Sequence, residues 1–445
     1  MRMACALIAF IGLLGFSGLA LFESRAADVF LETQRSEFQK IPIWVMGFGE
    51  GKAGGKIGKP IGAVMAEVLK ADLIRSQIFE VIDEPMPALE FSHSHCQETV
   101  LMGKAKESGA TVSSWGRIGK RNKKLVVDAC AYDGGNGNLA MGKRYIGEPI
   151  NSKLLRLMVH KWADELVSLY TGDSGIARTK IVYVKEDARG NRDLYIMDYD
   201  GFDPKQMTAE RRLSLMPVWS PDLSSLVYTT YKENNQEIIQ LHLASRAEKI
   251  LVNAQSLNIT PSFSPDGDLL AFASATGGNS DIYTLDLVTQ ERVKLTFHKS
   301  ADLSPTWSPN GREIAFTSDR GGRPQIYVMG ADGSNVRRLT FEGEYNAAPA
   351  WSPRGDWIVY VCQLPSQGFK LCRITPDGRK WAQITSGPKH QIDDSPSWAP
   401  DGRHLVFSSA RSGTSHIYMV NMDGTGLEQL TSGGTHHSSP SWSPL

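Results

Sequence analysis

Pro305-Thr306-Trp307-Ser308-Pro309 is one of six copies of a Pro-x-(Trp/Phe)-(Ser/Ala)-Pro motif in the second half of the chain. The copies begin at Pro217, Pro261, Pro305, Pro349, Pro396 and Pro440. Successive starting prolines are 44, 44, 44, 47 and 44 residues apart. A fixed period of this size is typical of stacked repeats, and ~40–45 residues is the usual length of a β-propeller blade. The repeat therefore predicts a propeller.

The third copy shows how one repeat divides into strands. After the turn pair Asn310-Gly311, residues 314–318 read as a strand, and a second strand follows at 325–329. Residues 337–340 form a third, and the strand around Trp351 is the fourth. Four short strands joined by glycine-containing turns match a propeller blade, whereas the apolar runs are too short for paired helices.

The ends of the array predict a closed ring. The first repeat body, 180–208, has no Trp motif in front of it, and the last motif, 440–444, has no body behind it. We therefore expect the C-terminal strand to complete the blade that begins near Ile181. Closure removes a dangling sheet edge, which would otherwise invite aggregation. The expected count is six blades, with the tryptophans packed between neighbouring blades.

The sequence before the repeats divides into three further parts. Residues 1–26 carry one charge and a long apolar run that ends in Ser24-Arg25-Ala26, which is typical of a signal peptide cleaved after Ala26. A retained membrane anchor is the alternative. Residues 27–171 are expected to form an α/β domain, residues 172–178 a linker and residues 179–445 the propeller.

Hydrophobic periodicity assigns the elements of the α/β domain. We expect strands at 42–48, 79–82, 112–115, 125–132 and 143–146. We expect helices at 61–75, 94–108 and 153–170, and Thr171-Gly172 should end the last helix.

Four cysteines remain after removal of the first 26 residues. Cys362 and Cys372 fall on consecutive strands of one predicted blade, near enough in register for a disulfide in an oxidising compartment. Free buried thiols are an equally open alternative. A pairing of Cys96 with Cys130 has less support.

Composition and motifs argue against nucleic-acid binding and catalysis. The chain carries 48 basic and 48 acidic residues, whereas phosphate binding needs a basic excess. No Gly-x-Ser-x-Gly nucleophile motif occurs. The glycine-rich run 49–54 is interpreted as a surface loop. The pair His436-His437 is also interpreted as part of a surface loop. We expect no catalytic residue, no cofactor and no metal site.

Several stretches resemble the TolB family, the periplasmic component of the Tol–Pal system. The most specific run through the domain junction, at 160–165, 169–176 and 179–184. There, TolB proteins carry a similar His-Lys-x-Ala-Asp helix, Leu-Thr-Gly-x-x-Gly-Ile turn and Thr-Lys-Ile-x-Tyr-Val strand. Residues 72–79 resemble the family's Asp-Leu-x-x-Ser-Gly-x-Phe, with Gln77 in place of glycine. Met46-Gly47-Phe48 departs from the family's Pro-Phe strand ending.

The resemblance implies a non-enzymatic, monomeric periplasmic adaptor that acts in outer-membrane integrity and in invagination during cell division. In the family, the propeller binds the lipoprotein Pal, and the mature N-terminus binds the inner-membrane protein TolA. An exported propeller enzyme or small-ligand binder is the alternative.

Two groups of residues are candidates for these contacts. For TolA we expect the N-terminal segment Asp28, Val29, Phe30, Leu31, Glu32 and Thr33, which could add as a strand to a partner sheet. For Pal we expect the position three before each starting proline, where polar side chains should crowd one mouth of the channel. It carries Asn258, Asp302, Asn346, Asp393 and His437, with Ser214 in the first copy.

Overall fold

The computed structural model describes residues 39–50, 61–82, 96, 107, 109–209, 213–232, 235–253, 256–276 and 278–445. The chain divides into two compact units at Gln39/Lys40, and all the described helices and strands belong to the unit that begins at Lys40. The expected signal peptide, the TolA segment 28–33 and the expected helix 94–108 lie outside the described ranges, apart from isolated positions in the last. Among the described residues, no helix is long and apolar enough to cross a membrane.

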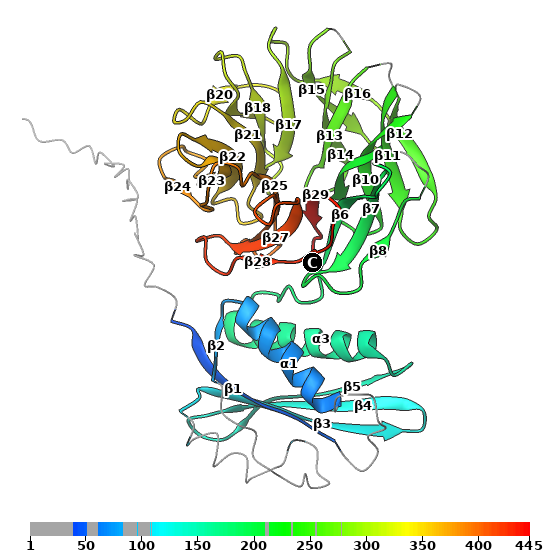
Figure 1. The fold of residues 1–445 in the computed structure, drawn as a ribbon, viewed down its shortest axis with the longest axis vertical. Helices are drawn as coiled ribbons and strands as arrows, with labels where there is room; N and C mark the ends of the chain where they lie inside the picture. The colour runs from blue at the N-terminus through cyan, green and yellow to red at the C-terminus, as the bar shows by residue number, and fades with distance from the viewer. Residues whose placement is uncertain are drawn as a thin grey trace, which may run out of the picture. The chain divides into compact units, whose positions relative to one another are not determined.

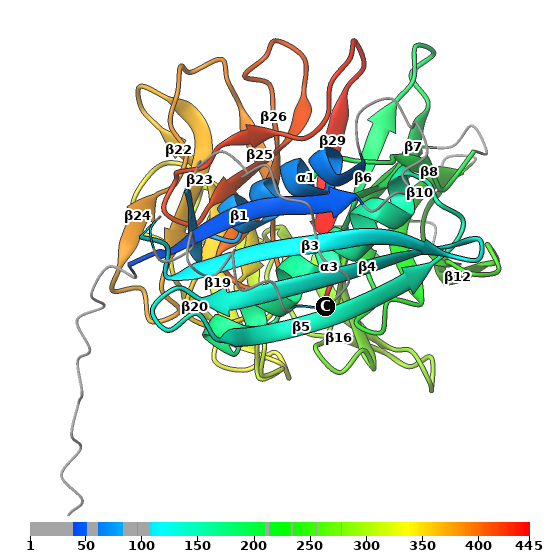
Figure 2. The same cartoon turned by 90° about the horizontal axis from the view of Figure 1, so that it is seen from below.

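A five-stranded sheet with two described helices precedes the repeats (Figure 2). Its order is β2-β1-β3-β4-β5, with β1 parallel to both neighbours and the remaining pairs antiparallel. The elements are β1 (Ile41–Glu50), α1 (Ile61–Arg75), β2 (Phe79–Ile82), β3 (Val112–Arg121), β4 (Lys124–Asp133), β5 (Leu139–Gly147) and α3 (Ser152–Thr171). Each strand expected there is present, and so are the helices expected at 61–75 and 153–170.

The capping of α3 follows from its sequence. The Asn151 side chain accepts a hydrogen bond from the backbone N–H of Leu154 at 2.9 Å, which satisfies one donor that a helix N-terminus leaves free. Gly172 ends the helix with a φ of 76°, the left-handed conformation that glycine adopts without strain. The expected end of this helix is confirmed.

The repeats form a β-propeller (Figure 1). Four sheets are separate and four-stranded. They comprise β13 (Asn258–Phe263), β14 (Leu269–Ser274), β15 (Asp281–Asp286), β16 (Arg292–Lys294); β17 (Asp302–Trp307), β18 (Glu313–Ser318), β19 (Gln325–Gly330), β20 (Arg337–Arg338); β21 (Asn346–Trp351), β22 (Ile358–Leu364), β23 (Gly368–Ile374), β24 (Trp381–Gln383); and β25 (Asp393–Trp398), β26 (His404–Ser409), β27 (His416–Asn421), β28 (Glu428–Gln429).

The remaining strands belong to one eight-stranded sheet. They are β6 (Lys180–Glu186), β7 (Arg192–Asp198), β8 (Lys205–Gln206), β9 (Leu213–Trp219), β10 (Ser225–Lys232), β11 (Asn235–His242), β12 (Glu248–Asn253) and β29 (His437–Trp442). Antiparallel pairing links β9 through β12, and separately links β29, β6, β7 and β8. One parallel residue pair, Arg192 with Leu213, joins the two sets.

The ring is closed by its last strand. β29 pairs antiparallel with β6, with Trp442 opposite Ile181 and Ser441 opposite Val182. The C-terminal strand therefore completes the sheet that begins near Ile181, as the unequal ends of the repeat array predict.

The motif tryptophans pack between neighbouring sheets. The indole N–H of Trp307 donates to the carbonyl of Ser262 in the preceding sheet at 3.2 Å, and Trp398 donates to Ala350 at 2.9 Å. Trp219 donates to Ser441 of the closing strand at 3.0 Å. These rings are at most 8 % exposed, so each buries apolar area and also satisfies its one polar atom. The expected structural role of the tryptophans is confirmed.

Candidate functional site

The innermost strands β9, β13, β17, β21, β25 and β29 line a channel of about 600 Å³. Its wall is largely apolar, with side chains such as Leu303, Ala347 and Val361 and the motif prolines. Asp394 is the one charged residue among the described residues that line it. Water can reach this carboxyl inside the channel, yet protein surrounds it. That burial raises the pKa of Asp394. A hydrogen bond from the backbone N–H of Ser395 lowers the pKa, but burial is the larger effect.

Each of these inner strands carries the same backbone feature, which the sequence analysis missed. The residue before each starting proline has a φ between 47° and 54°, in the left-handed region that side chains other than glycine rarely adopt. At that point two residues oppose one on the next strand, which defines a β-bulge. The six residues are Met216, Thr260, Ser304, Ala348, Ser395 and Ser439.

The residues predicted to form a polar rim do occupy one end of the channel strands, but their side chains are buried. Asn258, Asp302, Asn346, Asp393 and His437 are each the first residue of an inner strand and at most 2 % exposed. These side chains therefore form no exposed rim, and Pal binding through these residues stays a prediction. The spacing of the repeat correctly predicted their position at one end of the inner strands. It does not indicate whether a side chain there is exposed or covered by its neighbours.

Internal partners satisfy these buried groups. Asp302 receives two hydrogen bonds from Arg320 at 2.9 and 3.0 Å, and Asp393 receives two from Arg411 at 2.7 and 2.9 Å. The amide of Asn346 donates to Oε1 of Gln325 in the preceding sheet at 2.9 Å. Buried charges persist in proteins when they are paired in this way. These residues hold neighbouring sheets and loops together.

The exposed surface at the same end of the propeller consists of loops, which we call the loop face: residues 297–301, 319–324, 341–345, 386–392, 410–415 and 432–436. Hydrogen bonds join neighbouring loops, for example from the N–H of Ala301 to Oδ1 of Asp319 at 2.9 Å. A cleft of about 340 Å³ lies between Gly321–Arg323 and Gly343–Glu344.

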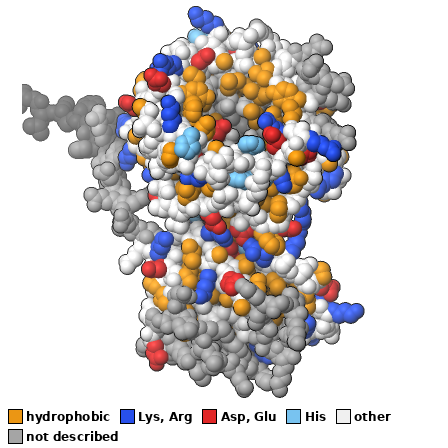
Figure 3. Space-filling model, in the orientation of Figure 1, with side chains coloured by type: hydrophobic (Ala, Val, Ile, Leu, Met, Phe, Trp, Pro, Cys, Tyr) orange, Lys and Arg blue, Asp and Glu red, His pale blue; other side chains and the backbone are white. Residues whose placement is uncertain are grey.

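Two phenylalanines stand out from the loop face. Phe297 is 78 % exposed and Phe341 is 71 % exposed, at equivalent positions of successive repeats. Each has a cation near its ring: Nζ of Lys294 lies 5.2 Å from the Phe297 centroid, and Cζ of Arg338 lies 5.0 Å from the Phe341 centroid. In Figure 3, hydrophobic side chains gather over the propeller part of the visible side, among basic and acidic ones. Exposed aromatic side chains next to arginine are typical of protein contact sites.

The opposite end of the propeller, which we call the domain face, contacts α1 and α3. It consists of the turns 199–203, 401–403 and 422–428. Arg75 of α1 donates to both carboxylate oxygens of Glu428, at 2.6 and 2.9 Å, and Nε2 of His404 lies 2.6 Å from the carbonyl of Arg75. Arg156 of α3 pairs with Asp200.

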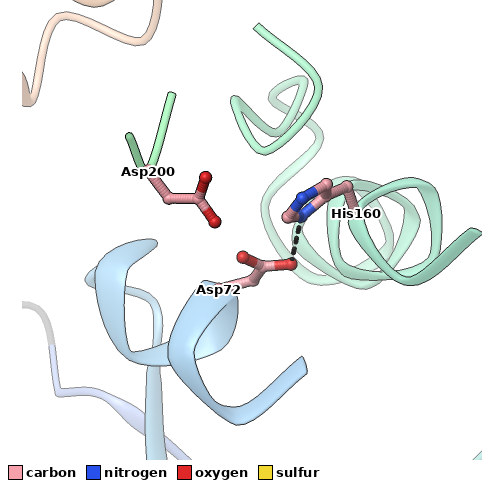
Figure 4. Close-up of side chains that lie close together, drawn as sticks. All are labelled: Asp72, His160 and Asp200. Carbon is pink, nitrogen blue, oxygen red and sulfur yellow. Dashed lines mark hydrogen bonds and ion pairs between the residues drawn. The ribbon is translucent and has the colours of Figure 1, made fainter. Parts of the chain in front are cut away.

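Figure 4 shows the centre of this contact, where Asp72, His160 and Asp200 come together from α1, α3 and a propeller turn. One ligand-type atom of each lies within 4.8 Å of the others. Nδ1 of His160 is 2.7 Å from Oδ2 of Asp72, and the hydroxyl of Tyr199 donates to the other oxygen at 2.5 Å. Burial, and next the Asp72 carboxylate, raise the pKa of Tyr199 well above its usual value, so the hydroxyl stays protonated.

This cluster is better suited to joining the two parts of the chain than to binding a metal. Asp200 already forms ion pairs with Arg156 and with Arg75, the latter at 4.0 Å. Both carboxylate oxygens of Asp72 already have hydrogen-bond partners, His160 and Tyr199. A divalent ion would have to displace these partners. Asp72 and His160 belong to the stretches that resemble the TolB family, so part of the resemblance lies in residues that form the contact between the α/β domain and the propeller.

The linker is fixed to the same face. Oδ2 of Asp173 accepts hydrogen bonds from Arg354 at 3.0 Å and from Arg403 at 2.6 Å. A Cβ on Gly175 would lie 2.4 Å from Oδ1 of Asp164, so only glycine allows this close approach. The same Asp164 oxygen accepts from the N–H of Ala177 at 2.7 Å.

The cysteines are joined in two disulfides, Cys96–Cys130 and Cys362–Cys372. Cys362 lies opposite Lys370 and Cys372 lies opposite Tyr360, so the second bridge runs diagonally between adjacent strands of one sheet. The bridge lies in the core between this sheet and the preceding one.

Comparison with known proteins places the fold among TolB structures. The structure of TolB from Acinetobacter baumannii superimposes with a TM-score of 0.77 at 24 % identity and covers 92 % of this chain and 97 % of that chain. At this identity the match establishes the fold alone, including the part before the propeller.

Sequence relatives carry the same name. The Tol-Pal system protein TolB of Legionella pneumophila subsp. pneumophila strain Philadelphia 1 is 28 % identical over 239 residues, which cover 53 % of this chain and 52 % of the relative. That of Anaeromyxobacter dehalogenans strain 2CP-1 is 33 % identical over 219 residues, or 47 % of each chain. The chain thus spans about half the length of the curated relatives that it matches.

The model of one family covers most of the chain. It describes the TolB β-propeller domain and matches residues 167–445, which include the whole ring from β6 to β29 and the end of α3. The chain therefore belongs to the TolB β-propeller domain family.

Proposed function

We propose that the chain is a non-enzymatic periplasmic component of the Tol–Pal system that acts as an adaptor between protein partners. The membership of residues 167–445 in the TolB propeller family carries the proposal. Its relatives are named as Tol-Pal system proteins. The adaptor would serve outer-membrane integrity and invagination during cell division, and it would work as a monomer.

The proposal includes a division of the chain. Residues 1–26 are a signal peptide, 27–171 an α/β domain, 172–178 a linker and 179–445 a six-bladed propeller. The blade count treats the eight-stranded sheet as two blades, since only the pair Arg192–Leu213 joins its two antiparallel halves. One of these halves is the blade that β29 completes.

Pal would dock on the loop face rather than on the buried residues at the strand starts. Phe297 and Phe341 offer two apolar anchors, each beside a cation, on two successive blades. A partner surface with apolar side chains ringed by carboxylates complements this chemistry. Desolvated aromatic anchors of this kind usually supply most of the binding energy of a protein interface.

TolA would bind the mature N-terminal segment 28–33, which precedes the described residues. Val29, Phe30 and Leu31 are apolar and are flanked by Asp28 and Glu32. A short segment of this kind can add as an extra strand to a partner sheet. The two partners would then use separate parts of the sequence.

The first test measures capture of purified Pal and of purified TolA by the mature chain. We expect the double variant Phe297→Ala, Phe341→Ala to weaken Pal binding at least tenfold, because each anchor contributes on the order of 1–2 kcal/mol. Its TolA binding should not change. Deletion of residues 27–33 should have the opposite result, with loss of TolA and retention of Pal.

The matched control is Val288→Ala. Val288 is 82 % exposed but lies in the turn between β15 and β16, away from the loop face. Equal Pal binding by wild type and the double phenylalanine variant would refute docking at the anchors. Failure of the wild-type chain to capture either partner would refute the adaptor itself.

A small-ligand binder is the second candidate, and the channel favours it. Its volume of about 600 Å³ lies within the range of ligand pockets, and Asp394 supplies one polar group on an apolar wall. A channel ligand would be sensitive to Asp394→Asn, whereas Pal docking at the anchors would not.

A further inference from the structure

One position of the channel strands differs in chemistry from its five equivalents. It is the residue two before each starting proline, next to the bulge of an inner strand. In the six copies it is Leu215, Ile259, Leu303, Ala347, Asp394 and Ser438. Four of these side chains are apolar and one is a hydroxyl. Asp394 alone is charged, and it lines the channel.

Asp394 has no positively charged partner among the described residues. Its Oδ1 accepts a hydrogen bond from the backbone N–H of Ser395 at 2.6 Å, and its Oδ2 has no partner within the described ranges. Basic side chains at this end of the strands are engaged elsewhere: Arg411 pairs with Asp393, and Nζ of Lys370 donates to backbone carbonyls. A carboxylate surrounded by protein costs free energy unless a cation or a set of donors pairs with it.

Two aromatic rings line the same region of the channel. The inner strands β21 and β25 contact each other, and Tyr345 directly precedes β21 while Asp394 is the second residue of β25. The ring of Tyr345 meets that of Phe369 edge to face, with centroids 5.2 Å apart. Burial and next the Asp394 charge raise the pKa of Tyr345. Aromatic faces attract cations, and a carboxylate forms strong hydrogen bonds with an ammonium group.

The rest of the channel suits an apolar body. Its volume of about 600 Å³ is bounded by the motif prolines and by side chains such as Leu303, Ala347 and Val361. Calcium takes roughly six to eight oxygen ligands, of which one carboxylate supplies at most two. The surroundings of Asp394 therefore favour an organic cation over an inorganic one.

We propose that the channel binds a small organic ammonium ion whose charged head pairs with Asp394. Tyr345 and Phe369 would pack against the head, and the apolar wall would hold the body of the molecule. This inference rests on the second candidate function, the channel as a ligand site, and names the class of ligand. Since the other five copies lack a carboxylate at this position, each chain would bind one ion.

The test titrates the mature chain by calorimetry with phenethylammonium and with 2-phenylethanol, which has a similar shape and no charge. We expect one ammonium ion per chain, bound about tenfold or more tighter than the alcohol, because a hydrogen bond to a charged group contributes at least that factor. Asp394→Asn should remove this preference while keeping the shape of the side chain. Asp394→Ser, which copies the sixth repeat, should do the same and provides a second variant if the first fails to fold.

The matched control is Asp332→Asn. Asp332 is an exposed carboxylate in the turn between β19 and β20, outside the channel, so the variant should bind phenethylammonium as the wild type does. Unchanged ammonium binding in both Asp394 variants would overturn the inference. Equal wild-type affinity for the two probes would also overturn it, yet would leave the channel as a site for neutral ligands. Absence of binding by either probe would refute the channel site as well.

A second arm separates a free amine from a basic side chain of a docked protein, which carries the same chemistry. Capture of Pal is measured with and without saturating phenethylammonium. We expect equal capture, which assigns the site to a free amine. Loss of capture would show that a partner side chain occupies the channel and would overturn the assignment to a small ligand. Capture without the probe reports on the adaptor separately, so the two proposals can fail independently.

Discussion

At the scale of single residues, the carboxylates at the start of the inner strands depend on their arginines. The Asp393 side chain is fully buried, and its strong partner is Arg411, whose side chain is 14 % exposed. Ser409 donates one further hydrogen bond to Asp393 at 2.5 Å. Removing one member of such a pair leaves an unpaired charge away from water, which costs more than the pair itself contributes.

We therefore predict that Arg411→Met lowers the free energy of unfolding by about 3–5 kcal/mol. The double variant Asp393→Asn, Arg411→Met should recover most of this loss, because the buried charge is then gone. Chemical denaturation of the two variants and the wild type measures both effects. An equal loss in the single and double variants would show that the arginine acts through packing alone.

The role of these residues also marks a limit of the sequence. Their spacing placed Asp302 and Asp393 correctly at one end of the channel strands. Whether a side chain there is exposed depends on Arg320 and Arg411, which come from a different strand-connecting loop about 18 residues away. Repeat spacing alone does not encode that contact. His437, interpreted as loop surface, is buried for the same kind of reason, because His416 covers it.

At the scale of elements, the proline in each inner strand is the signal for the missed bulge. Proline cannot donate to a sheet ladder, so within sheets it is confined to edge strands, first positions and bulges. The inner strand is the edge strand of each four-stranded sheet, and its proline lies at a bulge. Pro305, for example, follows the left-handed Ser304 and has no ladder partner on β18. The repeated motif thus carries both the fold and its irregularity.

The closing element gives a second prediction. Trp442 is 4 % exposed, and its indole N–H donates to Oγ1 of Thr179 at 2.7 Å. Trp442→Ala should lower the free energy of unfolding by about 3–5 kcal/mol, the usual cost of removing a buried tryptophan. Thermal and denaturant unfolding measure the loss.

Trp381→Ala is the control, since Trp381 lies on the outer strand β24 and is 45 % exposed. It should cost less than about 1 kcal/mol. If the two substitutions cost the same, burial at the seam does not determine the stability of the ring. The sequence allowed this prediction in outline, because the unequal ends of the array implied closure, but only the structure identifies Thr179 as the partner.

At the scale of the whole described unit, α1 is coupled to the propeller through Arg75. This side chain makes both hydrogen bonds to Glu428, and its backbone carbonyl lies at hydrogen-bond distance from His404. Hydrogen bonds to charged groups contribute about 1.5–3 kcal/mol each. We predict that Arg75→Met raises amide hydrogen exchange in residues 61–75 about tenfold or more, with little change in β13–β16.

Hydrogen-exchange mass spectrometry of the full mature chain measures this effect. Lys120→Met, an exposed substitution on β3, serves as the control and should leave exchange in α1 unchanged. A uniform rise across both parts would indicate global destabilisation and contradict a local coupling. The contact could not be predicted from the sequence, because Arg75 and Glu428 are 353 residues apart. No repeat motif relates the position of one residue to that of the other.

The pairing of β29 with β6 has a consequence for how the molecule is made. A ribosome builds the chain from its N-terminus, so the strand around residue 181 has no partner until residue 442 has been synthesised. In a chain that ends before β29, strand β6 keeps one unpaired edge and the propeller ring stays open. Only a full-length copy can hide that edge, so proteases that attack exposed strands can distinguish complete molecules from truncated ones.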